Sequence, residues 1–126
     1  MPRLSTTPFV IKKGDTGPSI QRTMEYSDST VEDLTAGSVV FEMTLALNNA
    51  PDPNATPITG ACVIVDAANG ICRYDWSAGD TDVVGEYVGE FKVTNAAGQV
   101  ITFPNGTIVA QAIYPDYIPI LVVQDV

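Results

Sequence analysis

Two segments of the sequence alternate apolar and polar residues with a period of two. Residues 39–47 read VVFEMTLAL and residues 86–94 read EYVGEFKVT. This is the period of an extended strand, whose successive side chains point to opposite faces, and it differs from the 3.6-residue period of a helix. Both segments are therefore predicted to be half-buried β-strands. The inward side carries Val39, Phe41, Met43, Leu45 and Leu47 in the first segment and Tyr87, Gly89, Phe91 and Val93 in the second.

Shorter β-rich runs surround these two segments, and each is bounded by a turn signal such as Gly14-Asp15 or Asn69-Gly70. Seven or eight strands at intervals of about ten residues are typical of an immunoglobulin-like sandwich. A length of 126 residues fits one such domain. The sequence predicts an all-β, immunoglobulin-like antiparallel β-sandwich over residues 1–114 with a short N-terminal arm, followed by an extended tail, residues 115–126.

The composition excludes several classes of function. Six Lys and Arg residues against 15 Asp and Glu give a net charge of -9, which repels nucleic acid and anionic membranes. Histidine is absent, which removes the usual general base and the commonest zinc ligand. The longest apolar run, IPILVV, is far shorter than the roughly 20 residues that span a bilayer. We expect no enzymatic activity, no cofactor and no metal. The start of the chain lacks a run of signal-peptide length, so synthesis in the cytoplasm of the cell that produces the chain is expected.

The acidic segment 79–87 allows two interpretations. Asp80 and Asp82 lie two residues apart and, with Asp75 or Glu86, offer oxygen ligands for calcium, although the EF-hand spacing is missing. Alternatively, Asp82, Gly85 and Tyr87 form the Asp-x-x-Gly-x-Tyr pattern of a corner that leads into a strand of an immunoglobulin-like sandwich. There the tyrosine hydroxyl bonds upstream backbone. We interpret the segment as this structural corner. A hydrolase that uses Asp80 and Glu86 is the least favoured reading.

Other chemically distinctive side chains have a structural and a functional interpretation. Cys62 and Cys72 flank the turn VDAANG and are expected to be reduced, buried thiols, with a cross-strand disulfide as the alternative. Trp76 and Tyr74 are expected on the inward side of a strand, with carbohydrate stacking as the alternative. The alternating charges Glu86, Glu90 and Lys92 are expected to form a solvated face rather than an acid/base pair.

Two segments are candidate contact regions. The loop 48–57, NNAPDPNATP, is rich in proline and asparagine and is expected to be exposed. The tail 115–126 contains two prolines that interrupt regular pairing, followed by a strongly apolar stretch. Such a patch normally finds a partner. We predict an intermolecular contact here, with packing back onto the domain as the alternative, through Tyr117, Ile118, Ile120, Leu121 and Val122.

The order of several short motifs resembles the N-terminal immunoglobulin-like domain of phage baseplate upper proteins. The similarity covers roughly residues 10–114 and rests on KGDTG (13–17), DLT (33–35), GICRYDW (70–76), DTD (80–82), GEY (85–87), EFKV (90–93) and TFP (102–104). The resemblance implies a non-enzymatic structural subunit of a tailed-bacteriophage particle, as a baseplate, tail or head accessory protein.

Its expected partners are other virion proteins and copies of itself, and its expected location is the virion. The family's domain usually heads a longer chain with coiled-coil or receptor-binding parts. This sequence ends soon after the domain, which favours a small accessory virion protein over direct host binding. The alternative is a module that binds a host-surface glycan or receptor through the 48–57 loop and nearby aromatic residues.

Overall fold

The computed structural model describes residues 8–48, 50–104, 107–109, 112–114 and 117–125. Within them the chain forms twelve strands and no helix, so the prediction of an all-β sandwich is confirmed. The predicted strand number of seven or eight is too low, since several short strands were not expected. No segment among these residues is a helix long and apolar enough to cross a membrane.

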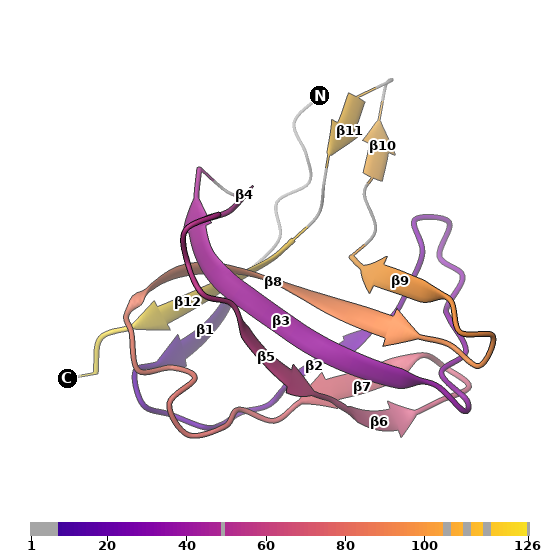
Figure 1. Ribbon diagram of the computed structural model, residues 1–126, viewed down its shortest axis with the longest axis horizontal. Helices are drawn as coiled ribbons and strands as arrows, with labels where there is room; N and C mark the ends of the chain where they lie inside the picture. The colour runs from indigo at the N-terminus through magenta and orange to yellow at the C-terminus, as the bar shows by residue number, and fades with distance from the viewer. Residues whose placement is uncertain (1–7, 49, 105–106, 110–111, 115–116, 126) are drawn as a thin grey trace.

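The larger sheet has seven strands and is built on the two alternating segments. Strands β3 (Ser38–Leu47) and β8 (Gly85–Thr94) pair antiparallel along most of their length and run side by side through the centre of Figure 1. The remaining strands pair outward from this central pair: β4 (Ala50–Pro51) and β5 (Ile58–Ala61) with β3, and β9 (Val100–Phe103) and β12 (Ile118–Val123) with β8, while β1 (Phe9–Lys12) pairs with β12.

The smaller sheet has three strands in the order β2 (Ile20–Thr23), β7 (Ile71–Tyr74) and β6 (Val63–Asp66). The run of residues 58–66 divides between the two sheets. Its first half, β5, pairs with β3, and its second half, β6, pairs with β7, with Cys62 between them. The chain therefore passes from one layer of the sandwich to the other at Cys62. A separate hairpin of β10 (Thr107–Val109) and β11 (Ala112–Tyr114) projects away from both sheets (Figure 1).

The core lies between the two sheets and is centred on aromatic rings. Phe41 of β3 stacks on Tyr74 of β7 with ring centroids 4.8 Å apart, and it meets Trp76 edge-on at 5.7 Å. All three side chains are buried, and Trp76 Nε1 donates a hydrogen bond to Pro18 O at 3.0 Å. Trp76 is thus a core residue, and the carbohydrate-stacking alternative for it is wrong because its ring is not presented to solvent.

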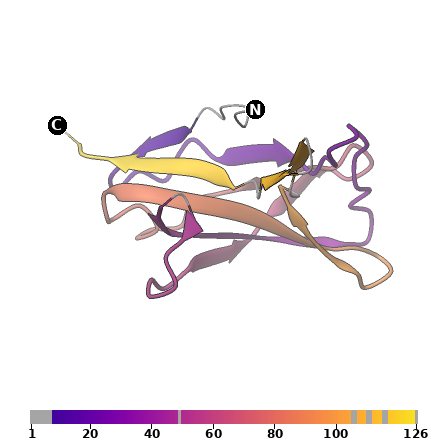
Figure 2. The same ribbon diagram turned by 90° about the horizontal axis from the view of Figure 1, so that it is seen from above.

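Residues 118–123 belong to the sandwich, so the expectation of a tail outside it is wrong for this segment. They form β12, which pairs in parallel with β1 on one side and antiparallel with β8 on the other (Figure 2). Ile118, Ile120 and Val122 are buried in the core. The physical reason is that Pro119 does not prevent pairing. Strand β1 pairs with β12 only from Ile120 onward, so the proline precedes the part of β12 that is paired on both sides.

Candidate functional site

The predicted corner segment carries a short hydrogen bond within its own turn. Tyr87 is the first buried residue of β8. Its hydroxyl donates a hydrogen bond to Val83 O, four residues upstream, at 2.7 Å. Gly85 is the first residue of β8, and the side chain of Asp82 is exposed. Burial raises the pKa of Tyr87. The hydroxyl therefore meets upstream backbone, which is the contact that the corner interpretation requires.

The neighbouring acidic residues bond to protein groups instead of converging on one point. Asp80 Oδ2 accepts from the Tyr74 hydroxyl at 2.6 Å and from Ser77 N at 2.9 Å. Asp75 Oδ1 accepts from Ser19 Oγ at 2.5 Å and from Arg73 Nε at 2.9 Å. Over the residues that the structure describes, no group of three or more His, Cys, Asp or Glu side chains is placed to hold a metal ion. The arrangement favours a structural role for these carboxylates.

The sequence contains the triplet Gly-Asp-Thr twice, at residues 14–16 and 79–81, and the two copies lie in contact. Gly14 N donates to Thr81 O at 3.0 Å, and Thr81 Oγ1 donates to Asp15 O at 2.8 Å. Thr81 is almost completely buried. The acidic loop is thereby tied to the loop that follows β1, which gives it a rigid attachment to the sandwich.

Cys62 and Cys72 lie next to each other without a disulfide bond. Both are free thiols, and Cys72 is fully buried. The interaction between the two thiols raises the pKa of Cys62, to which burial also contributes, and lowers that of Cys72. The pair lies at the point where the chain changes sheets, and its observed contacts are those of packed core residues.

The five predicted tail residues are divided between the core and the surface. Ile118, Ile120 and Val122 face the core, as described above, whereas Tyr117 and Leu121 are partly exposed. Both backbone edges of β12 are taken up by β1 and β8 over residues 120–122. These residues cannot extend the sheet of a neighbouring molecule while this pairing holds. Whether Tyr117 and Leu121 contact a partner stays a prediction.

A pocket opens on the outer face of the larger sheet, away from the core. Its floor is formed by β3 and β8, where Thr44 pairs with Val88 and Glu42 pairs with Glu90. Strand alternation places these side chains on the outward side, and Glu90 among them is predicted to lie on a solvated face. Thr44 and Val88 are nevertheless buried, with exposed fractions of 9% and 7%.

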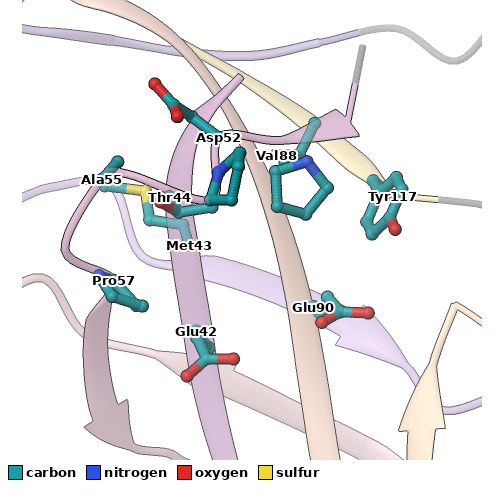
Figure 3. A pocket seen from close by; sticks show the side chains of 11 residues that line it. Glu42, Met43, Thr44, Asp52, Ala55, Pro57, Val88, Glu90 and Tyr117 are labelled. Atoms are coloured by element: carbon teal, nitrogen blue, oxygen red, sulfur yellow. The ribbon is translucent and has the colours of Figure 1, made fainter. Parts of the chain in front are cut away.

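The cover over this part of the sheet comes from the 48–57 loop. Asn48 has a positive φ of 55°, and β4 folds back against β3, with Asp52 N donating to Leu45 O at 2.8 Å. The walls of the pocket are then completed by Tyr117, which directly precedes β12, and by residues of the loop: Pro51, Asp52, Pro53, Ala55 and Pro57 (Figure 3). The volume of this open pocket is about 330 Å³. The contact loop and one predicted tail residue thus converge on one site.

The pocket is acidic and contains groups whose interactions are incomplete. Glu42 and Glu90 lie directly opposite each other on paired strands, an arrangement of like charges that destabilises a sheet. Lys92 Nζ lies 3.3 Å from Glu42 Oε1, and no ion pair joins Glu90 to another described residue. Burial raises the pKa of Glu90, and the negative charge of Glu42 raises it further, against the opposing effect of Lys92. Thr44 Oγ1 is buried without a hydrogen-bond partner among the described residues.

Sequence reasoning missed this pocket because it treated the outer faces of the two strands as solvated. The alternation in each strand shows which side chains face outward, but it does not show what covers them. The proline-rich loop after β3 was the one available signal, since prolines at 51, 53 and 57 make a rigid segment that can fold back over the strand it follows. Glu42 faces Glu90 only because of the register of β3 against β8.

Comparisons with known proteins assign most of the sandwich to one family. A family model described as the BppU N-terminal domain matches residues 7–118. This range extends from the segment before β1 to the first residue of β12. Neither the curated proteins nor the solved structures include a significant match to the chain.

Proposed function

Since the chain belongs to the family of baseplate upper protein N-terminal domains, which are structural parts of a phage baseplate, we propose that it is a non-enzymatic subunit assembled by protein-protein contacts. The family match over residues 7–118 is the observation that carries this proposal, because it covers nearly the whole sandwich. The family implies interaction with other virion proteins. Contacts between copies of this chain are the finer part of the proposal.

The chemistry of the described residues supports a structural role. Two carboxylates of the acidic region, Asp75 and Asp80, are engaged by Ser19, Arg73, Tyr74 and Ser77. The hydrogen bonds of Thr81 and Tyr87 lock the surrounding loop to the fold. A rigid sandwich that presents loops and a pocket suits a subunit that is positioned among neighbours.

The proposal is tested on purified phage particles. Quantitative mass spectrometry of particles from a density gradient should find peptides of this chain in constant ratio to the other baseplate proteins. The purified chain, mixed with those proteins, should also form a complex that elutes as one species in size-exclusion chromatography. Absence of the chain from intact particles would refute the assignment to the baseplate.

Recognition of a host-surface glycan is the second candidate, and the pocket under the 48–57 loop favours it. Carboxylates such as Asp52 and the ring of Tyr117 are groups that commonly contact sugars, and both line the pocket. Binding of the isolated protein to a glycan array, abolished by Asp52→Ala, would support this function. A silent array together with co-assembly with baseplate proteins would favour the structural function.

A further inference from the structure

The pocket contains a polar group that nothing in the described chain satisfies. The Thr44 side chain is more than nine-tenths buried, and its hydroxyl lacks a hydrogen-bond partner among the described residues. A buried hydroxyl without a partner destabilises the folded state, and such groups are uncommon in native proteins. Thr44 is among the residues that line the pocket (Figure 3), so this unsatisfied group lies beside the space that a ligand would occupy.

The charge of the pocket points to a positively charged ligand. Three carboxylates line it, those of Glu42, Asp52 and Glu90, and none of the Lys and Arg residues that the structure describes does. Lys92, the nearby cation of the same sheet face, is engaged by Glu42. Glu90 is left beside a like charge and partly removed from water, which is the cause of its raised pKa. A cation that enters the pocket removes this repulsion.

The hydrogen-bonding character of the pocket narrows the kind of cation. The polar side chains that line it are carboxylates, which accept only, and the hydroxyls of Thr44 and Tyr117. A guanidinium group carries five N-H donors and no acceptor, and its planar fork matches carboxylates. A small metal ion fits less well, because the three carboxylates are not placed to converge on one point.

The apolar part of the wall fits the stem of a long side chain. Pro51, Pro53 and Pro57 line the pocket together with Val88, so its wall is largely aliphatic. Figure 3 shows the carboxylates of Glu42 and Glu90 on neighbouring strands, on the far side of the pocket from Asp52. An arginine side chain presents this same combination, an apolar stem with a charged tip. A neutral sugar uses neither the negative charge nor the aliphatic wall fully.

We propose that this pocket is a binding site for an arginine side chain on a neighbouring protein of the virion, with Glu90 and Glu42 receiving the guanidinium group. The inference rests on the proposed function, because it names the chemistry of a contact through which the subunit is held in the baseplate. Asp52 and Tyr117 add further polar groups to the same pocket. The 48–57 loop then acts as the wall that shields this contact from water.

The test uses nuclear magnetic resonance of the full chain with the peptide acetyl-Gly-Arg-Gly-amide as probe. The matched control peptide replaces arginine by citrulline, which keeps the shape and removes the charge. The arginine peptide should shift the amide signals of Glu42, Thr44 and Glu90 and should bind at least about tenfold more tightly than the citrulline peptide, since a charged hydrogen bond contributes that much.

Variants of the chain assign this binding to the pocket. Glu90→Gln should lower the affinity for the arginine peptide about tenfold. Glu86→Gln is the matched control, because Glu86 lies on the same face of β8, is exposed and does not line the pocket. It should leave the affinity unchanged within about twofold. Thr44→Val removes the unsatisfied hydroxyl and should fold at least as stably as the native chain.

The arginine site would be overturned if the two peptides bound with equal affinity, or if Glu86→Gln and Glu90→Gln weakened the binding of the arginine peptide equally. It would also be overturned if the amide signals that shift belonged to another surface, or if N-acetylglucosamine or galactose shifted the signals of the pocket residues and the arginine peptide did not. A co-assembly experiment with the baseplate proteins distinguishes failure of the arginine site from failure of the proposed function. If native and Glu90→Gln chains co-assemble equally, the arginine site fails and the structural role stands. If the native chain does not co-assemble, the proposed function itself fails.

Discussion

Replacing Ile120 by alanine should destabilise the fold strongly, because β12 is a core strand. Ile120 has no exposed surface, and its Cδ1 lies only 2.8 Å from where a Cβ on Gly89 would be. This tight packing against the backbone of β8 leaves little room for collapse around a smaller side chain. Deleting a buried isoleucine side chain costs about 2 to 5 kcal/mol, and we expect about 3 to 4 kcal/mol here. That is a large part of a typical total stability of about 5 to 15 kcal/mol.

The assay is urea unfolding followed by Trp76 fluorescence, with Leu121→Ala as the control. Leu121 is the next residue of β12 and faces the other side of the sheet, where it is only partly buried. Its replacement should lower the free energy of unfolding by about 1 kcal/mol or less. In both variants the slope of this free energy against urea concentration should be unchanged. Equal losses, or a larger loss for Leu121→Ala, would refute the placement of Ile120 in the core. A stable Ile120→Ala variant that fails only in assembly would restore the tail interpretation.

Three further perturbations test other parts of the structure. Tyr87→Phe removes the 2.7 Å hydrogen bond to Val83 O and should lower the free energy of unfolding by about 1 to 2 kcal/mol; a change near zero in urea unfolding would contradict the structural corner. Gly60→Ala would place a Cβ 2.5 Å from Tyr74 Cε1 and should destabilise by about 1 to 3 kcal/mol with altered near-ultraviolet circular dichroism, and an unperturbed spectrum would argue against this packing. The pKa of Tyr74 is raised to about 12 by burial and by its bond to Asp80, and that of Tyr26 to about 12 by its bond to Glu32. Because the unfolded chain loses these protons near pH 10 and the folded chain retains them, stability should fall as the pH rises above about 10. Tyr74→Phe should reduce this pH dependence, and an unchanged one would contradict the assignment.

The parts of the fold that could be predicted from the sequence are those with a strong local pattern. The alternation in residues 39–47 and 86–94 identified β3 and β8, because one face of each strand is buried and the other is not. Leu47 departs from this pattern and is exposed, since it lies at the end of β3, where the opposite layer no longer covers it. Local periodicity therefore predicted the centre of each strand better than its end.

The position of β12 could not be read from local pattern. Two prolines preceded or interrupted the apolar run, and prolines usually exclude a strand from the interior of a sheet. The run was therefore placed outside the sandwich. The sequence does not reveal that β1 pairs with β12 only from Ile120 onward. Because the pairing begins there, Pro119 does not have to donate a hydrogen bond to β1. A constraint of this kind appears only once three strands are assembled.

The candidate site was predictable only in fragments. The 48–57 loop and Tyr117 were each identified as contact regions, but nothing in the sequence joined them. The decisive features are the opposition of Glu42 and Glu90 and the burial of Thr44 on an outer face. Both depend on strand register and on a loop folding back, which are tertiary properties.

A cryo-electron microscopy map of the intact particle tests the central claim most directly. It should contain this sandwich in symmetry-related copies in the baseplate, with the outer face of β3 and β8 against a neighbouring chain. A map in which other proteins explain all of the baseplate density, with no copy of this domain, would contradict the claim that the chain is a baseplate subunit.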